Sequence, residues 1–140
     1  DTLKLKNIIM TGYINEQHIP LILNKSSLLY ITLKNDEMVN STIPSKFQNY
    51  LAAGKPILAS ISGETANIIN QCKCGIVCPP ENSIELSKTI LKMKKLSPNI
   101  LDNMGNNGKQ YFLDNFHPNE VIDKLCMYIN KSINKLPNEK

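Results

Sequence analysis

The sequence predicts an α/β fold in which a parallel β-sheet is covered on both faces by helices. Short apolar runs alternate with segments of helical period as far as Pro80, and the pattern beyond Pro80 is purely helical. The chain has 140 residues, of which 41% are hydrophobic, as expected for one globular domain. Because a connection between parallel strands needs a crossover helix, this alternation favours a parallel sheet.

The first strands and helices follow from short patterns. Residues 8–10, which end at Gly12, are predicted to form the first strand. A helix is predicted over about residues 19–25, with Pro20 in its first turn. The second strand is predicted over residues 28–33.

A polar loop over residues 34–42 precedes the next helix. That helix has apolar positions at i, i+3, i+4 and i+7, namely Phe47, Tyr50, Leu51 and Gly54. Gly54 is expected to end it as a C-terminal cap. The third and fourth strands are predicted over residues 56–59 and 75–78, with a helix after Gly63 between them.

Three further helices are predicted after the last strand. Asn82 and Glu85 have the spacing of a capping box. The predicted buried stripe of this helix consists of Leu86, Ile90 and Met93. Pro98 opens the next helix, whose predicted inner face is Leu101, Met104, Gly105, Gly108, Tyr111 and Phe112. Its two glycines indicate a close approach to another segment of backbone.

Pro118 is expected to open the last helix, with Ile122, Leu125, Ile129 and Ile133 facing inward. No internal repeat or low-complexity linker divides the chain. We therefore predict a single domain over residues 1–140, in which residues 81–136 are the helical C-terminal portion.

Composition excludes several classes of protein. No apolar run approaches the roughly 20 residues of a membrane span, and the sequence does not start like a signal peptide, so a cytoplasmic location is expected. All sixteen basic residues are lysine. Proteins that read nucleic-acid sequence depend on arginine, so no nucleic-acid partner is expected.

The cysteines and histidines do not form a recognisable site. The spacing of Cys72, Cys74, Cys78 and Cys126 disfavours a zinc site or a disulfide framework and predicts reduced, buried thiols. Neither histidine is expected to be catalytic, and no metal site is expected.

Three turns are candidate binding sites. Pro44, Ser45 and Lys46 stand at a helix start, where free N–H groups and a mobile charge suit a phosphate. The turn formed by Ser62, Gly63, Glu64 and Thr65 leads into another helix directly after a strand, and a glycine there lets a ligand approach closely. Tyr13, after Gly12, would lie against a nucleobase. Ordinary helix capping, an ordinary turn and a tyrosine packed at a sheet edge are the respective structural alternatives.

The run from Pro44 to Ala59 resembles the "PSK…EYMAAGKPVVA" segment of the family 4 glycosyltransferases of GT-B fold. Four other segments resemble landmarks of that family in the same order: Thr11 to Ile14, Gly63-Glu64, Gly75 to Pro80 and Met104 to Gly108. The resemblance covers roughly residues 8–116. It is closest to bacterial surface-polysaccharide enzymes that transfer amino sugars such as fucosamine.

This resemblance implies a Rossmann-like donor-binding domain, the C-terminal half of a GT-B fold, in a retaining transferase of polysaccharide or glycoconjugate synthesis. It implies a nucleotide-sugar substrate, with UDP as the expected nucleotide, and no cofactor. Tyr13 and Ile14 would lie near the base, and Ser45 and Lys46 near the diphosphate. Gly63, Glu64 and Thr65 would lie near the sugar or the phosphates. No catalytic nucleophile is assigned, so catalysis would rest on stabilising the departing diphosphate.

Two departures from the family pattern matter. The family's Glu-x7-Glu pair corresponds here to Ser41 and Asn49, and Asn49 can hydrogen bond to a ribose but carries no charge. The family also has two earlier strand–helix units and an acceptor-binding half, which this sequence lacks. We therefore expect an N-terminally truncated domain that is inactive alone, with sheet edges that would need a partner or pair in a dimer.

The missing half would carry the sugar or lipid-linked acceptor and any peripheral contact with the inner face of the plasma membrane. Two alternative functions stay open: a nucleotide-sugar 2-epimerase of the same fold and a non-catalytic nucleotide-sugar-binding or assembly module. Asn49 favours the module, whereas the histidine and glutamate sets of the epimerases find no match in this sequence.

Overall fold

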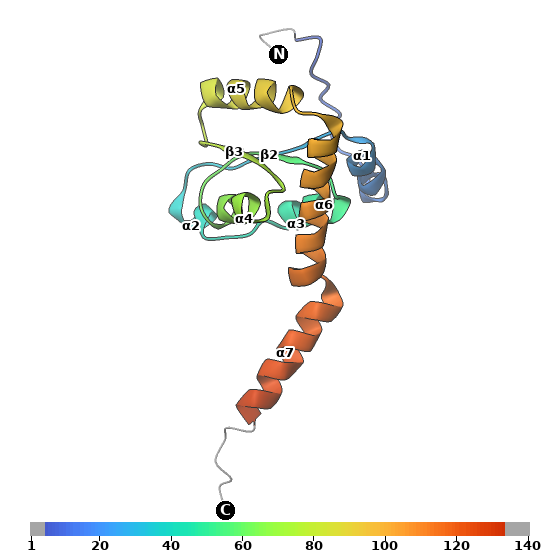
Figure 1. The fold of residues 1–140 in the computed structure, drawn as a ribbon, viewed down its shortest axis with the longest axis vertical. Helices are drawn as coiled ribbons and strands as arrows, with labels where there is room; N and C mark the ends of the chain where they lie inside the picture. Colours follow the sequence, from blue (N-terminus) through green and yellow to red (C-terminus); the bar gives the residue numbers. More distant parts are fainter. Residues whose placement is uncertain (1–4, 134–140) are drawn as a thin grey trace, which may run out of the picture.

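A computed structural model describes residues 5–133, and its centre is a small parallel sheet (Figure 1). The sheet contains β1 (Leu29–Thr32), β2 (Ile57–Ser60) and β3 (Gly75–Cys78) in that order. In the register of the sheet, Ile57 pairs with Leu29 on one side and with Gly75 on the other. The predicted α/β class and parallel sheet are confirmed.

The connections between strands explain how the helices are distributed over the two faces. Helices α2 (Glu37–Asn40) and α3 (Ser45–Ala53) connect β1 to β2, and α4 (Glu64–Cys72) connects β2 to β3. Each of these connections leads to the next strand on the same side of the sheet. Because such connections are usually right-handed, α3 and α4 lie on one face. Helix α5 (Ser83–Lys94) covers the other face (Figure 1).

Helix α6 (Pro98–Asn115) packs across α3 and closes that side of the domain. A side chain on Gly105 would collide with the backbone of Gly54, and one on Gly108 would press on Leu51 and Cys74. The predicted close backbone approach is therefore confirmed. Gly54 itself ends α3 in the left-handed conformation, with φ of 64°.

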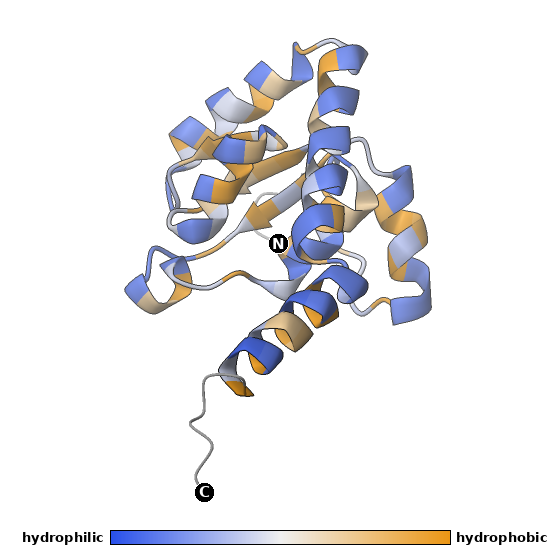
Figure 2. Ribbon diagram, turned by 60° about the horizontal axis from the view of Figure 1, so that its bottom comes forward, coloured by the Kyte–Doolittle hydropathy of each residue, from blue (hydrophilic) through white to orange (hydrophobic). Residues whose placement is uncertain are grey.

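The hydrophobic core lies between the sheet and these helices. All four residues of β2 are buried, as expected for a central strand. Phe47 and Leu51 of α3 and Ile69 of α4 are completely buried against them. Figure 2 shows the same arrangement, with hydrophobic residues gathered on the strands. This packing fixes the starts of α3 and α4 relative to the sheet.

The prediction of a first strand over residues 8–10 is wrong. These residues form neither helix nor strand, and Ile9 is 85% exposed. A strand needs a neighbour to pair with it, and within residues 5–133 the sheet consists of β1, β2 and β3, with β1 at its edge. The segment instead leads in an extended path to η1 (Glu16–His18) and α1 (Ile19–Lys25), and α1 coincides with the predicted helix.

Two predicted buried stripes also need correction. Helix α7 (Pro118–Ile133) begins where predicted but extends away from the body of the domain (Figures 1 and 2). Its supposedly inward residues are about half exposed: Ile122, Leu125, Ile129 and Ile133. On α5, Met93 is buried and Leu86 partly so, but Thr89 takes the buried position expected for Ile90. None of the helices within the described range has the length and apolarity needed to cross a bilayer.

Candidate functional site

The candidate site lies at the C-terminal edge of the sheet, where α3 and α4 begin. The N-caps of these helices are Pro44 and Gly63, and neither provides a side-chain hydrogen bond to the first turn. Each helix start therefore presents free backbone N–H groups and the positive end of its dipole. Two such starts side by side are suited to binding an anion.

Direct contacts hold the two helix starts together. The Thr65 hydroxyl, in the first turn of α4, donates a hydrogen bond of 3.2 Å to the carbonyl oxygen of Thr42, two residues before the Pro44 cap. Thr65 itself is buried. Its side chain thus positions the loop that leads into α3, rather than being free to bind a ligand.

Gly63 has a structural role that the sequence did not reveal. Its φ of 79° and ψ of −153° lie in a region that glycine alone occupies readily. A side chain at this position would collide with the carbonyl group of Asn40. The sequence predicts that this glycine allows close approach of a ligand. In the structure the glycine allows close approach of the protein's own backbone at Asn40.

A polar network beside Gly63 joins the ends of all three strands. The Ser62 hydroxyl lies 2.9 Å from Oδ1 of Asn40 and 3.0 Å from Oδ1 of Asn35, so it donates to one or the other. Asn40 Nδ2 donates to the same Asn35 oxygen at 3.1 Å. The backbone N–H of Asn35 donates to Oε2 of Glu81 at 3.3 Å.

Sequence reasoning missed Asn35, Asn40 and Glu81. Asn35 and Glu81 each follow the end of a strand by three positions, as Ser62 does by two, and this is the signal that would have found them. Asn40 lies in α2, a single helical turn inside the predicted polar loop. That turn is stabilised by Asp36, which accepts hydrogen bonds from the backbone of Met38 and Val39.

The predicted residues of α3 are exposed at the same edge. Ser45 and Lys46 are the first two residues of the helix, and both side chains are exposed. Within residues 5–133 the single ion pair joins Lys88 to Glu85, which leaves the Lys46 ammonium group without a carboxylate partner. Asn49 follows Ser45 by four positions, so the two lie on one face of the helix.

Asn49 also lines a groove between α1 and α3. The groove has a volume of about 680 Å³, and its other lining residues include Glu16, Leu23, Asn24 and Ala53. A second groove, of about 570 Å³, lies at the opposite end of the sheet beside Lys25, Lys55 and Asp102. The first groove lies along the later part of α3, from Asn49 to Ala53, and neither groove is lined by Ser45 or Lys46.

The structure does not bring Gly12, Tyr13 and Ile14 into the site. They belong to the extended segment before η1, and Tyr13 is 91% exposed. Gly12 has a φ of 67° and no atom near the place of a side chain. The structural alternative, a tyrosine packed at a sheet edge, also fails, because the strand expected before Tyr13 does not form.

The comparison with protein families decides what this arrangement belongs to. The family model described as "Glycosyl transferases group 1" matches residues 1–111, a span that contains the whole sheet, α3, α4 and most of α6. The chain belongs to the group 1 glycosyltransferases. Members of such a family transfer a sugar from a donor to an acceptor. No curated protein and no solved structure matches this group 1 glycosyltransferase significantly.

Family membership agrees with the geometry at the sheet edge. Open parallel sheets bind ligands outside the carboxyl ends of their strands, and the matched span ends in α6, which packs behind α3. Helix α7 lies outside the matched residues. The candidate site of this group 1 glycosyltransferase is thus built entirely from the matched part of the chain.

Proposed function

We propose that this chain supplies the donor-binding part of a retaining, family 4 type glycosyltransferase that uses a nucleotide sugar, with UDP as the expected nucleotide. The observation that carries the proposal is the pair of uncapped helix starts, α3 and α4, held side by side at the C-terminal edge of the sheet. A diphosphate carries the charge that such a pair attracts.

The diphosphate would lie against the start of α3. Backbone N–H groups of Ser45 and Lys46 point from the helix start, and the Lys46 ammonium group can reach a phosphate oxygen. Because Lys46 has no ion pair within residues 5–133, it need not break one to bind a phosphate. A charge-assisted hydrogen bond of this kind contributes about 1.5–3 kcal/mol.

The nucleoside would extend along α3 toward the groove that Asn49 lines. The Asn49 amide can donate to and accept from ribose hydroxyl groups, although it lacks the charge of a carboxylate. The mostly apolar lining of the groove, including Leu23 and Ala53, suits the face of a base. In this arrangement Tyr13 would approach the base only if the segment before η1 moved.

The sugar would lie at the start of α4. The exposed carboxylate of Glu64 can accept hydrogen bonds from sugar hydroxyl groups, and it lies at the helix end where a negative charge is favourable. As the bond between the sugar and the diphosphate breaks, negative charge grows on the leaving diphosphate. The helix dipoles and Lys46 would stabilise that charge in the transition state.

A non-catalytic binding module is the second candidate. Asn49, in place of the glutamate that the family resemblance implies, is the observation that favours it. Such a module would bind the nucleotide sugar at the same helix starts without transferring the sugar. Binding tests the site, and transfer to an acceptor by the full-length protein would distinguish the enzyme from the module.

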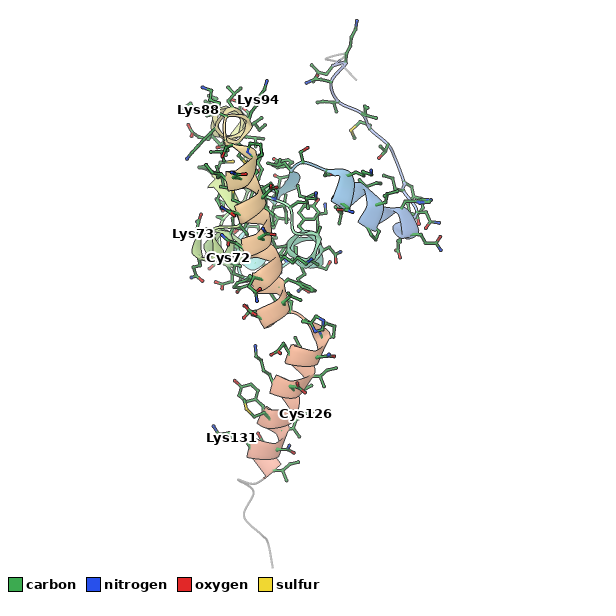
Figure 3. All side chains as sticks on the ribbon, turned by 45° about the vertical axis from the view of Figure 1, so that its right-hand side comes forward. Cys72, Lys73, Lys88, Lys94, Cys126 and Lys131 are labelled. Atoms are coloured by element: carbon green, nitrogen blue, oxygen red, sulfur yellow. The ribbon has the colours of Figure 1, made fainter. Side chains whose placement is uncertain are left out.

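Calorimetric titration of the chain with UDP, GDP and UDP-N-acetylhexosamines tests the proposed site. We expect saturable binding of UDP, weakened about 10- to 100-fold by Lys46→Ala. The matched control is Lys94→Ala, which removes an exposed lysine of α5 far from α3 (Figure 3). Equal effects of the two substitutions, or no binding of any nucleotide by the folded chain, would contradict the proposed site.

A further inference from the structure

Two thiols meet at the other end of α4, away from the proposed donor site. Cys72 is the last residue of α4, and Cys74 directly precedes β3. Lys73 between them is left-handed, with φ of 55° and ψ of 38°. When a residue has the φ and ψ of a right-handed or a left-handed helix, the Cα atoms of the residues before and after it are about 5.4 Å apart. This separation falls inside the range of about 4.4–6.8 Å that disulfides require.

The surrounding backbone already fixes both cysteines. The backbone N–H of Cys74 donates to the carbonyl oxygen of Ile69 at 3.2 Å, and its own carbonyl oxygen accepts from Ile57 N–H at 3.0 Å. These bonds join the end of α4 to the sheet. A covalent bond between Cys72 and Cys74 would therefore close a turn that exists before it forms.

The two thiols differ in access to solvent. Cys72 is partly exposed, as its place at a helix end allows, whereas Cys74 is fully buried. Cys78 is also buried, whereas Cys126 is exposed on α7, well separated from Cys72 (Figure 3), so the prediction of buried thiols is wrong for Cys126. Within residues 5–133 no group of three possible metal ligands includes them. Of the two thiols of the pair, an oxidant in solution would thus meet Cys72 first, with Cys74 as its neighbour.

The environment also favours ionisation of Cys72. A hydrogen bond from the Cys74 thiol lowers the pKa of Cys72 to about 7, against the opposing effect of burial. The C-terminal end of α4 acts in the opposite direction, because a helix dipole disfavours negative charge there. A lowered pKa favours the thiolate of Cys72, the form that reacts with peroxides and disulfides, whereas the hydrogen bond to Cys72 and burial raise the pKa of Cys74.

We propose that Cys72 and Cys74 form a reversible disulfide when the protein meets a peroxide. The Cys72 sulfur attacks one oxygen of hydrogen peroxide, the O–O bond breaks, and one water leaves as Cys72 becomes a sulfenic acid. The Cys74 sulfur then attacks Cys72, the S–S bond forms, and the sulfenic oxygen leaves as a second water. The two thiols lose two electrons and two protons, and the peroxide is reduced to two waters. A dithiol reductant reverses the change.

Peptide mapping of the peroxide-treated protein tests this proposal. The folded chain is treated with one equivalent of hydrogen peroxide, free thiols are blocked with N-ethylmaleimide, and trypsin is added. Trypsin cleaves after Lys73, so the proposed disulfide would hold together two peptides that otherwise separate. We expect this linked pair, and its loss after treatment with dithiothreitol.

Two alanine variants identify the sulfur that reacts with Cys72. The linked pair should persist in Cys78→Ala, which alters another buried thiol, and should disappear in Cys74→Ala. In Cys74→Ala the Cys72 sulfenic acid should instead be trapped by dimedone. Linkage of Cys72 to Cys78 or Cys126, or conversion of wild-type Cys72 directly to sulfinic acid, would overturn the proposal. Residues 74–88 form one tryptic peptide that contains both Cys74 and Cys78. Fragmentation of the linked pair from the wild-type protein shows whether N-ethylmaleimide is on Cys78, as the proposal requires, or on Cys74, and so decides the matter even if Cys74→Ala fails to fold.

Discussion

Gly63 shows how one residue can serve the site through the backbone. Its left-handed φ of 79° and its contact with the Asn40 carbonyl let α4 begin beside the loop that leads into α3. The two helix starts converge because this position has no side chain. A bulkier residue would push apart the elements that form the proposed anion site.

Gly63→Ala is expected to lower the free energy of unfolding by more than about 2 kcal/mol. The strain of a positive φ and the collision with the Asn40 carbonyl both destabilise the folded state. Gly12→Ala is the matched control, with a similar φ of 67° but open space around it. It should lower the free energy by only about 1–2 kcal/mol. Urea unfolding followed by circular dichroism measures both, and equal losses would contradict the proposed role of the Asn40 contact.

Burial of two tyrosines makes the free energy of unfolding depend on pH in the alkaline range. Burial raises the pKa of Tyr50 and Tyr111 above 10.0 in the folded state. The raised pKa values contribute fully to the free energy of unfolding at pH values below the tyrosine pKa of the unfolded chain, about 10. This contribution is lost as the pH rises through the higher pKa values of the folded state. The free energy of unfolding should therefore fall as the pH rises above about 10. Tyr50→Phe should flatten part of this decline.

At the scale of the elements, α3 and α7 have similar apolar periodicity, but the apolar face of α3 is buried and that of α7 is exposed. Leu51 of α3 is 0% exposed, and Leu125 of α7 is 56% exposed. Leu51→Ala should lower the free energy of unfolding by about 2–5 kcal/mol, because it leaves a cavity. Leu125→Ala should change it by about 0.5 kcal/mol or less. Comparable losses in urea unfolding would show that α7 packs against the domain.

Local patterns predicted the elements whose formation depends on nearby residues. Pro98 and Pro118 correctly marked helix starts, Gly54 correctly marked a helix end, and the strand over residues 75–78 was correct. Periodicity failed where the outcome depends on distant partners. Residues 8–10 have the apolarity of a strand but do not pair with the open edge of β1, and α7 has an apolar face with nothing in the described chain to cover it.

The candidate site was partly predictable for the same reason. Ser45, Lys46 and Glu64 could be placed at helix starts from local signals, and the parallel topology then brought those starts to one edge. The polar network could not be predicted, because Asn35, Asn40 and Ser62 meet only after β1 and β2 pair. Tyr13 was misplaced because its position depended on the strand that does not form.

At the scale of the whole molecule, a net charge of +4 supports the attraction of an anionic donor. All of the positive charge is on lysine, which binds phosphate as a point charge rather than through a bidentate fork. Exposed charges are screened over about 10 Å at 0.1 M salt. Affinity for UDP should therefore fall several-fold when the salt concentration in the titration is raised to about 0.5 M. A salt-independent affinity would indicate binding through the base alone.

The most direct test of the central claim is a nuclear magnetic resonance titration of the ¹⁵N-labelled chain with UDP. We predict that the largest changes in amide chemical shift fall on Ser45, Lys46, Glu64 and Thr65, at the two helix starts. Changes centred instead on Lys25, Lys55 and Asp102, in the groove at the opposite end of the sheet, would contradict the proposed donor site.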